Sequence, residues 1–375
     1  MAKRSSKKKK INPTAQATLE ADIAALPKVD MLQDLPSFED LRVRDSQVEA
    51  FNAYVASAEE AIPYELGCVI RLDRGFPLVA TANRTVRAEH AHALAKGDHL
   101  LPAIGDWVVL ACPLGHDMGR IDAVLPRATA FERWRGKNRG EKQTLAANVD
   151  TVLIVQALNS DPLRCGRLAR SLVLVNDCGA RPVILLTKAD RKASPQDLQA
   201  DIDMVRSVCG DVEILVTSAF ANEGLDDVRR VIPAGTIAMI LGESGAGKST
   251  LLNGLLGHEA AATQCVREKD DMGRHTTVAR VMYALEGCGV MADAPGLRSL
   301  PLVGHERGLA ITFPEIVRAA HGCKFRDCTH THEPGCEVLA QCEQGNISAE
   351  RLEVFLTLAS EMRVSAQSLD PDIVL

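Results

Sequence analysis

Apolar and polar positions divide the chain into a β-rich part and a later part in which strands and helices alternate. Between about residues 64 and 135, short β-prone runs are separated by Gly, Asp and Pro, which is typical of a small all-β barrel. These runs are Cys68–Leu72, Leu78–Thr81 and Asp106–Leu110. We therefore expect a barrel domain in the first half of the chain.

From residue 151 onward, apolar runs alternate with helical stretches. The runs are short and rich in β-branched residues, as expected of strands that are buried on both faces. They are Thr151–Ala157, Pro182–Leu186, Glu213–Val216, Thr236–Leu241 and Gly289–Ala292. Right-handed crossovers through the helices predict a mostly parallel sheet with helices on both sides, which is an α/β domain.

The two ends of the chain follow neither pattern. Residues 1 to about 60 are polar and then helical in character, so we expect a tail and a surface helix. The last 80 or so residues lose the strand rhythm and end in a predicted helix near Ala349–Glu361. No apolar stretch reaches about 18 residues, and the basic start is not followed by an apolar core, so neither a membrane span nor a secretory signal is expected.

Charge and cysteine content narrow the function classes. A net charge of -6 argues against a uniformly basic nucleic-acid binder, although Lys and Arg dominate the first ten residues and no acid is among them. Such a block is either a solvated tail or an arm that contacts a phosphate backbone. Eleven cysteines in a long chain without a signal favour reduced thiols and a metal site, and therefore a cytoplasmic location.

A phosphate-binding loop follows the fourth apolar run. The segment GESGAGKST fits the pattern G-x-x-x-x-G-K-[ST] and precedes a helical stretch, which is the context that this motif needs. Its backbone N–H groups are expected to face phosphate oxygens, Lys248 to contact the β and γ phosphates, and Ser249 to ligate Mg²⁺. The motif predicts a nucleoside triphosphate without indicating its base. Its members are Gly242, Glu243, Ser244, Gly245, Ala246, Gly247, Lys248, Ser249 and Thr250.

The base is indicated by the segment Thr187-Lys188-Ala189-Asp190, which follows the second apolar run and resembles the N-K-x-D guanine motif of GTPases. An ionised Asp190 accepts hydrogen bonds from guanine N1–H and the exocyclic amine, whereas adenine offers no donors there. Two such bonds at about 1.5–3 kcal/mol each favour GTP over ATP by roughly 10²–10⁴. Lys188 is expected to lay its aliphatic stem along the base. Thr187 replaces the usual Asn, which puts in doubt the contact that joins this loop to the phosphate loop.

Two further segments complete a GTPase set. The segment Ser218-Ala219-Phe220 follows the third apolar run and resembles the S-A-K/L loop, whose backbone N–H contacts guanine O6. Asp293 and Gly296 fit D-x-x-G, in which Asp293 serves Mg²⁺ through water and the Gly296 N–H meets the γ phosphate. The base segments precede the phosphate loop, which reverses the ordinary order. Because ligands bind at the carboxyl ends of parallel strands, the same pocket can form in a circularly permuted chain.

A compact cysteine and histidine cluster follows these motifs. Its three thiols and one imidazole form a closed set that is typical of one structural zinc ion. The ligands are Cys323, Cys328, His330 and Cys336, with His332 as an alternative ligand and Cys342 as a bystander. A full coordination shell does not activate water, so the ion is expected to fold a small domain rather than to catalyse.

The chain resembles the ribosome small-subunit-dependent GTPase A (RsgA) family in three features. These are the permuted motif order, the segment GRHTT at residues 273–277, and the cysteine and histidine cluster. The resemblance covers roughly residues 64 to 360. It implies an N-terminal OB-fold barrel, a circularly permuted GTPase domain, and a C-terminal, mainly helical zinc-binding domain. We accordingly expect a basic tail and extension at 1–60, the OB-fold at 61–140, the GTPase domain at 141–303 and the zinc domain at 304–375.

The resemblance also implies a function. Members of the family bind the small ribosomal subunit late in its maturation, and the subunit stimulates hydrolysis. We therefore expect a cytoplasmic, monomeric GTP hydrolase that binds GTP or GDP and the ribosomal RNA of that subunit, without membrane contact. The alternatives are a P-loop ATPase or small-molecule kinase, against which Asp190 argues, and a nucleotide-regulated RNA-binding protein. The intact Lys248, Ser249 and Asp293 argue against an RNA-binding scaffold that needs no nucleotide.

Hydrolysis requires a group that orients the attacking water. Leu297 stands where Ras-like enzymes carry Gln, and an apolar side chain cannot position water. His275 is the candidate, since the family is thought to use the histidine of GRHTT in this role; the alternative is that His275 is merely an exposed loop residue. Thr277, with Thr276 as the alternative, is expected to sense the γ phosphate. The predicted catalytic residues are therefore His275, Lys248 and Thr277.

A basic segment lies near the exit of the predicted barrel. It contains Arg133, Trp134, Arg135, Lys137, Arg139 and Lys142. From the charges alone it is either a solvated linker loop or a contact for ribosomal RNA, and the family resemblance favours RNA.

Overall fold

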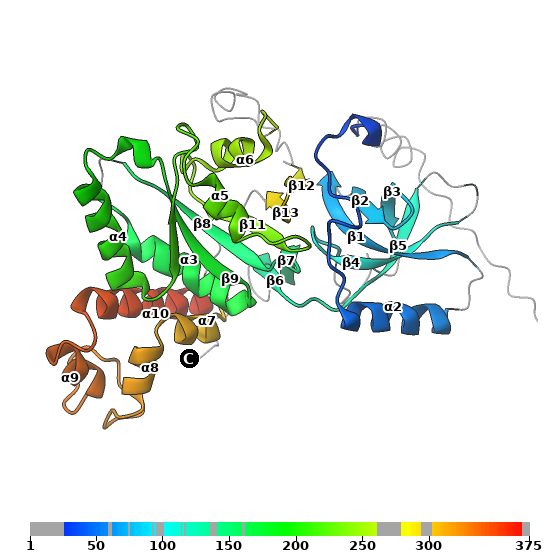
Figure 1. Cartoon of the computed structure of the whole chain (residues 1–375). Coiled ribbons are helices and arrows are strands. Elements are labelled where there is room, and N and C mark those ends of the chain that lie inside the picture. Colours follow the sequence, from blue (N-terminus) through cyan, green and yellow to red (C-terminus); the bar gives the residue numbers. More distant parts are fainter. Residues whose placement is uncertain are drawn as a thin grey trace, which may run out of the picture.

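The computed structural model of the chain describes residues 26–58, 62–73, 76–91, 94, 101–113, 115, 118–135, 141–159, 162–260, 279–293 and 302–369. Figure 1 shows a β-barrel on the right, an α/β part on the left and a group of C-terminal helices below the α/β part. None of the described helices is long and apolar enough to span a bilayer.

The barrel forms where the sequence predicted it. Its described strands are β1 (Tyr64–Asp73), β2 (Phe76–Thr81), β3 (Thr85–His90), β4 (Trp107–Ala111) and β5 (Gly119–Val124). They follow the order β1-β2-β3-β5-β4, and pairing of β1 with β4 closes an OB-like barrel. The barrel core contains Val69, Val79, Val108 and Ile121, which are fully buried. Closure satisfies the hydrogen bonds of both edge strands, and this is why such short strands form a stable unit.

The strands of the α/β part are β8 (Thr151–Ala157), β9 (Arg181–Thr187), β10 (Glu213–Val216), β11 (Ile237–Gly242), β12 (Arg280–Ala284) and β13 (Val290–Asp293). The order is β10-β9-β8-β11-β13-β12, and the pairs from β10 to β13 are parallel. β12 runs antiparallel to β13 and also pairs with barrel strand β1, so one continuous mixed sheet joins the two parts. The last strand of the α/β part, β12, therefore has the barrel strand β1 as its neighbour.

Helices cover both faces of this sheet. Along β8, Val152 and Ile154 face a core shared with α3 (Cys165–Cys178) and α4 (Pro195–Cys209). Leu153 and Val155 face the opposite core, which is shared with α5 (Leu225–Arg230) and α6 (Lys248–Leu256). A strand that is buried on both faces needs a continuous apolar run, and β8 supplies one from Val152 to Val155.

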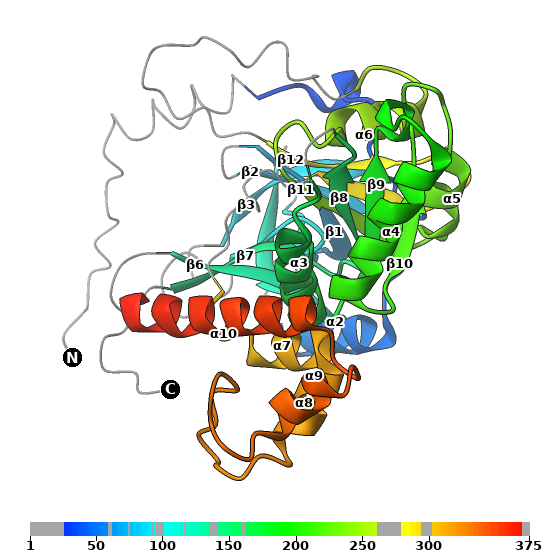
Figure 2. The ribbon, with the colours of Figure 1, turned by 90° about the vertical axis from the view of Figure 1, so that its left-hand side faces the viewer.

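The C-terminal helices are α7 (Glu306–Thr312), α8 (Pro314–Ala320), α9 (Glu337–Glu343) and α10 (Ala349–Leu369). The long α10 lies across α3 at the lower side of the α/β part (Figure 2). The buried guanidinium of Arg351 on α10 contacts the Glu315 carboxylate and donates to the carbonyls of Val208 at 2.5 Å and Thr312 at 2.7 Å. Arg351 therefore joins α4, α7 and α8 at one point.

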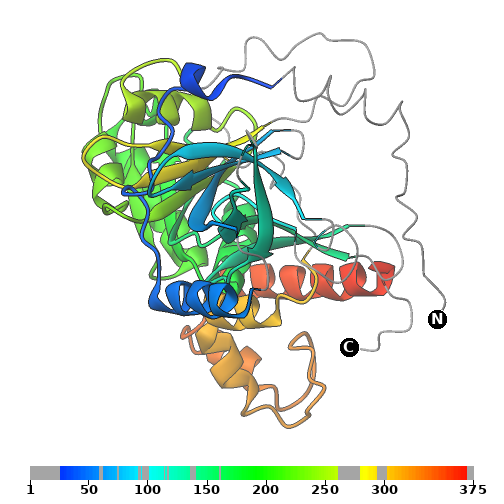
Figure 3. The same ribbon diagram turned by 90° about the vertical axis from the view of Figure 1, so that its right-hand side faces the viewer.

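The N-terminal extension does more than form a tail and a surface helix. The predicted helix is present as α2 (Asp45–Ser57), and Tyr54 packs edge-on against Tyr64 of the barrel; Figure 3 shows α2 beneath the barrel. The segment before α2, which includes the short helix η1 (Val29–Met31), reaches the α/β part. There the Asp34 carboxylate lies 3.0 Å from His258, and Arg42 N–H donates to the Gly235 carbonyl at 3.1 Å.

The basic segment at the barrel exit is a β-hairpin where it is described, and not a linker loop. The hairpin consists of β6 (Ala130–Arg135) and β7 (Glu141–Ala147), with Trp134 opposite Lys142. Lys137 and Arg139 lie outside the described residues.

Candidate nucleotide site and metal centre

The phosphate loop connects β11 to α6, as the motif requires. Gly245 and Gly247 have φ angles of 76° and 90°, in the left-handed region that favours glycine. At Gly242 a Cβ atom would lie 2.6 Å from the Val155 carbonyl oxygen, so only glycine lets β11 and β8 approach this closely. Lys248 Nζ donates to the carbonyls of Gly242 at 2.8 Å and Glu243 at 2.5 Å. The ammonium group therefore lies over the mouth of the loop.

The base loop, at the end of β9, is bonded directly to the phosphate loop. The buried Thr187 hydroxyl donates to the Ala246 carbonyl at 2.6 Å. Lys188 has a φ of 61° and donates from Nζ to the Gly245 carbonyl at 2.6 Å. The doubt raised by the replacement of Asn with Thr is thus resolved, because the threonine hydroxyl makes the connection itself.

A second loop supports Asp190. Ser218 is fully buried, and its hydroxyl donates to Asp190 Oδ1 at 2.5 Å, while Ala189 N–H donates to the Thr217 carbonyl at 3.1 Å. Ala189 and Asp190 lie in the short helix η2 (Ala189–Arg191), directly after Lys188. These bonds hold the Asp190 carboxylate in one orientation at the carboxyl end of the sheet.

The three loops enclose one pocket of about 390 Å³. It is lined by Thr187, Lys188, Asp190, Arg191, Ala219, Phe220, Gly247, Thr250 and Leu251. The two base segments, which precede the phosphate loop in sequence, therefore meet that loop in space, as the permuted order predicted. Sequence reasoning did not include Arg191, Phe220 or Leu251 in the site, although each is adjacent in sequence to a residue that it did include.

Charged side chains in the pocket and on the phosphate loop have neighbours of opposite charge. Burial, and after it the positive charge of Arg191, lowers the pKa of Lys188, while the Asp190 carboxylate opposes this change. On the phosphate loop, the Glu243 carboxylate forms an ion pair with Arg167 of α3. Arg167 thus offsets a negative charge that would otherwise oppose a bound phosphate.

The residues expected to serve Mg²⁺ lie on neighbouring elements. Ser249 is in the first turn of α6, and Asp293 ends β13. Since β13 pairs in parallel with β11, Asp293 lies beside the strand that leads into the phosphate loop. A hydroxyl and a carboxylate are hard oxygen ligands that suit Mg²⁺. His275, Thr276, Thr277 and Gly296 lie outside the described residues.

The cysteine and histidine cluster assembles as its spacing predicted. The ligand atoms of Cys323, Cys328, His330 and Cys336 all lie within 4.8 Å of one another. His330 Nδ1 is 3.6 Å from Cys323 Sγ and 3.4 Å from Cys336 Sγ, and the two sulfurs are 3.9 Å apart. Tetrahedral zinc bonds require about 3.6 Å between nitrogen and sulfur and about 3.8 Å between sulfurs. The distances therefore match a tetrahedral metal site.

Protonation and the neighbouring side chains fit the same ligand set. Burial lowers the pKa of His330, which favours the neutral imidazole that binds metals. Desolvation, followed by interactions with Cys336 and Cys323, raises the pKa of the Cys328 thiol to about 12. His332 does not belong to the described cluster; its Nδ1 lies 2.8 Å from the Thr331 hydroxyl.

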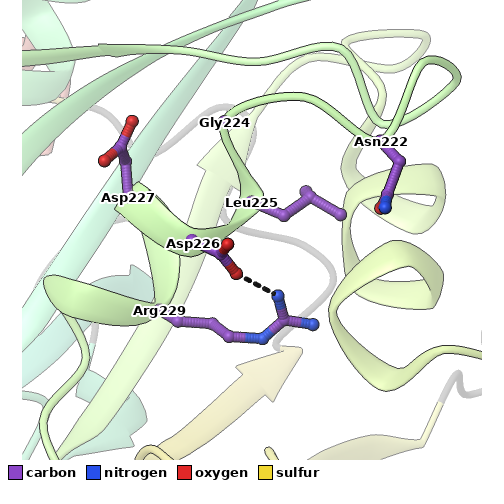
Figure 4. Close-up of a pocket in the computed structure, with 6 residues that line it drawn as sticks. All are labelled: Asn222, Gly224, Leu225, Asp226, Asp227 and Arg229. Carbon is purple, nitrogen blue, oxygen red and sulfur yellow. Dashed lines mark hydrogen bonds and ion pairs between the residues drawn. The ribbon is translucent and has the colours of Figure 1, made fainter.

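A smaller cavity of about 260 Å³ lies at the start of α5, and Figure 4 shows its lining residues. Arg229 donates to Asp226 at 3.0 Å and to the Leu255 carbonyl at 3.1 Å. At Gly224, whose φ is 72°, a Cβ atom would lie 2.3 Å from the Val216 carbonyl oxygen. Arg229 therefore links α5 to α6, and the turn that leads into α5 admits only glycine at position 224.

The fold and the pocket define a circularly permuted GTPase, in which the base loops precede the phosphate loop. The family model for the RsgA GTPase matches residues 124–303. Among curated proteins, the chain is 41% identical over 317 residues to "Small ribosomal subunit biogenesis GTPase RsgA" of Streptomyces coelicolor, covering 84% of each chain. It is 39% identical over 269 residues to the protein of the same name from Methanosarcina acetivorans, covering 72% of each. The chain belongs to the RsgA GTPase family.

Two solved structures share the fold. YjeQ from Thermotoga maritima matches with a TM-score of 0.62 at 22% identity, over 80% of this chain and 99% of that chain. YloQ, described as a circularly permuted GTPase, matches with a TM-score of 0.59 at 22% identity, over 82% and 98%. These two structures confirm the fold, and the family model together with the curated relatives confirms the predicted family.

Proposed function

We propose that this protein binds GTP in the pocket between Asp190 and the phosphate loop, hydrolyses it to GDP and phosphate, and acts in the late maturation of the small ribosomal subunit. The observation that carries the nucleotide part is the single pocket lined by Asp190, Ala219 and Gly247. The printed names of the curated relatives, which are small ribosomal subunit biogenesis GTPases, support the ribosomal part.

Selectivity for guanine rests on Asp190. The hydrogen bond from the Ser218 hydroxyl reaches Oδ1 and orients the carboxylate toward donors on the edge of the base. Guanine presents two N–H donors there and adenine presents none, so GTP is favoured by roughly 10²–10⁴. The Ala219 N–H serves guanine O6, and the Lys188 stem covers one face of the ring.

The phosphate end requires a magnesium ion, which Ser249 and Asp293 would hold. When bound, the ion supplies positive charge to the β and γ phosphates. Lys248 stabilises the charge that develops on the transferred phosphoryl group, and the Gly296 N–H contacts the γ phosphate. His275 orients the attacking water in place of the absent glutamine, and Thr277 reports the presence of the γ phosphate.

Contact with the ribosomal subunit involves the β6–β7 hairpin, where Arg133, Trp134, Arg135 and Lys142 lie on two paired strands. Cationic and aromatic side chains on a two-stranded ribbon suit phosphate contacts and base stacking. A structural zinc ion held by Cys323, Cys328, His330 and Cys336 would fix the C-terminal helices. The protein works as a monomer in the cytoplasm, divided into the extension, the OB-fold, the GTPase domain and the zinc domain at the boundaries predicted above.

The decisive experiment measures turnover of GTP and ATP by the full chain, with and without purified small ribosomal subunits. We expect turnover of GTP, no turnover of ATP, and stimulation by the subunit that the Lys248→Ala variant loses. Equal turnover of ATP would overturn the assignment of the base, and the absence of stimulation would overturn the ribosomal part. A His275→Ala variant that keeps full stimulated turnover would remove His275 from the mechanism.

A further inference from the structure

One side chain of the phosphate loop is negatively charged, although the loop is built to hold an anion. Glu243 follows the first glycine of the loop, and its backbone carbonyl accepts from Lys248 Nζ at 2.5 Å. Because Lys248 is the residue assigned to the β and γ phosphates, the backbone of Glu243 lies close to the place of these phosphates. A carboxylate there repels a polyanion unless a cation lies beside it.

The neighbouring cation is Arg167, in the first turn of α3. Its Nη1 donates to the Glu243 carboxylate, although the two residues are 76 positions apart in sequence. The side chains of Arg167 and Glu243 are 49% and 57% exposed, so their ion pair adds little to the stability of the fold. Among the described residues, Glu243 is the one side-chain partner of this guanidinium. A guanidinium has five N–H donors, so Arg167 has donors left for a second anion.

The helix that presents Arg167 is held in place on both sides of this residue. Arg167 N–H donates to the Arg164 carbonyl at 2.9 Å, and the Ser171 hydroxyl donates to the Arg167 carbonyl at 3.0 Å. Three residues on, Arg170 Nη2 donates to the Glu361 carboxylate of α10 at 2.7 Å. α3 follows β8, which pairs in parallel with β11, the strand that leads into the phosphate loop. A fixed helix therefore presents Arg167 beside that loop.

The base pocket and the ion pair lie at opposite ends of the phosphate loop. Gly247 and Thr250, at the α6 end of the loop, line the pocket together with Asp190. Glu243 lies at the β11 end and does not belong to the lining of this pocket. The helices α3 and α6 also cover opposite faces of the sheet. A nucleotide whose base occupies the pocket therefore extends its phosphates along the loop toward the β11 end, where Arg167 lies.

Resting on the proposed function, we infer that Arg167 binds the γ phosphate of GTP, while Glu243 holds the guanidinium in position through the ion pair. A planar guanidinium bridges a carboxylate and a phosphate through separate N–H donors. GDP lacks the γ phosphate, so this contact distinguishes the triphosphate from the diphosphate. The same positive charge stabilises the charge that develops on the γ phosphoryl group during hydrolysis.

The test compares the affinities for GDP and for GTPγS, a slowly hydrolysed GTP analogue, by calorimetry with Mg²⁺. Arg167→Ala should weaken GTPγS binding about ten- to a hundredfold. GDP binding should weaken by less than about threefold, because the unpaired Glu243 carboxylate is half exposed and water and salt screen its charge. Retained GDP affinity also shows that the variant is folded.

Two further variants serve as comparisons. Arg167→Lys keeps the charge but loses the planar fork, so its loss of GTPγS affinity should be smaller than that of Arg167→Ala. Arg206→Ala is the matched control, since it removes the same charge from α4, where the partner is Asp203 at 3.8 Å. This control should bind GDP and GTPγS as the wild type does.

Glu243→Gln separates a phosphate contact from simple charge compensation. In Arg167→Ala the unpaired carboxylate itself opposes the phosphates, and adding Glu243→Gln removes that repulsion. If Arg167 contacts the γ phosphate, the double variant should bind GTPγS at least about tenfold more weakly than Glu243→Gln alone. Equal GTPγS affinity in the double variant and in Glu243→Gln would reduce Arg167 to a counter-charge and overturn the contact.

The other outcomes are distinguishable from one another. Equal weakening of GDP and GTPγS in Arg167→Ala overturns the γ-phosphate contact, because it assigns the effect to the phosphates that both nucleotides share. Unchanged affinities with loss of subunit-stimulated turnover assign Arg167 to a contact with the subunit, which also overturns the inference. Failure of the wild type to bind either nucleotide overturns the proposed function itself.

Discussion

The Thr187 hydroxyl donates a hydrogen bond to the Ala246 carbonyl at 2.6 Å, joining the base loop to the phosphate loop inside the protein. The two residues are 59 positions apart in sequence and belong to different strand–loop units. Because the bond is buried, movement of one loop is coupled to the other. The pocket is therefore organised before a nucleotide arrives.

Thr187→Val tests this coupling. Valine has nearly the same shape but lacks the donor, so the Ala246 carbonyl loses its partner in a buried place. We expect GDP affinity to fall by about tenfold, measured by calorimetry. Thr187→Ser keeps the hydroxyl and serves as the control. Equal affinity in the valine and serine variants would show that the two loops are not coupled through this bond.

The barrel contains a carboxylate that makes its stability sensitive to acid. Asp73 Oδ2 accepts from Arg71 Nε and Arg87 Nη1, both at 2.7 Å, and its side chain is 7% exposed. Burial alone would raise the pKa of Asp73, but the two arginines outweigh it and lower that pKa below 3.8. A lowered carboxyl pKa contributes stability above the unfolded value and loses it as pH falls through the folded value.

We therefore expect Asp73→Asn to lower the free energy of unfolding by about 1–3 kcal/mol at pH 7. The difference from the wild type should shrink as the pH falls from about 5 through the lowered folded-state pKa of Asp73, where the wild-type carboxylate becomes protonated. Urea unfolding at a series of pH values measures this. A difference that stays constant over that range would rule out Asp73 as the titrating group.

We expect loss of the metal centre to lower the stability of the fold without changing nucleotide binding. Cys336→Ser should abolish binding of one zinc ion per chain, measured by elemental analysis, and lower the melting temperature. GDP affinity should stay unchanged, since the cluster is not part of the nucleotide pocket. His332→Ala and Cys342→Ser are the controls and should retain zinc. Loss of zinc from His332→Ala would replace His330 by His332 in the ligand set.

Strands could be predicted from the sequence wherever apolar residues form a continuous or regularly spaced run. The strands β8 and β10 have the bounds that their apolar runs predicted, since strands buried on both faces carry a continuous signal. Shorter or partly polar strands, such as β3 and β12, were missed. The pairing of β12 with barrel strand β1 was also invisible, because contact between two domains leaves no periodic pattern in either one.

Residues of the nucleotide site could likewise be predicted only where they belong to a short motif with fixed spacing. Motif residues such as Asp190 and Lys248 were found because phosphate and guanine chemistry fixes their types and spacing. Arg191 lines the same pocket but belongs to no motif, so only the fold places it there. Similarly, the hydrogen bond from Thr187 to Ala246 forms because two loops meet in space. The motif has Asn at this position, so the sequence alone left open whether Thr187 makes a contact with the phosphate loop.

The central claim is that Asp190 reads the base of the nucleotide that Lys248 holds by its phosphates, and Asp190→Asn tests it most directly. The asparagine carbonyl still accepts from the Ser218 hydroxyl, while its amide offers a donor that suits the C2 carbonyl of xanthine instead of the C2 amine of guanine. We predict that the wild type binds GDP more tightly than XDP by calorimetry, and that Asp190→Asn reverses this preference. An Asp190→Asn protein that keeps the wild-type preference for GDP would contradict the account.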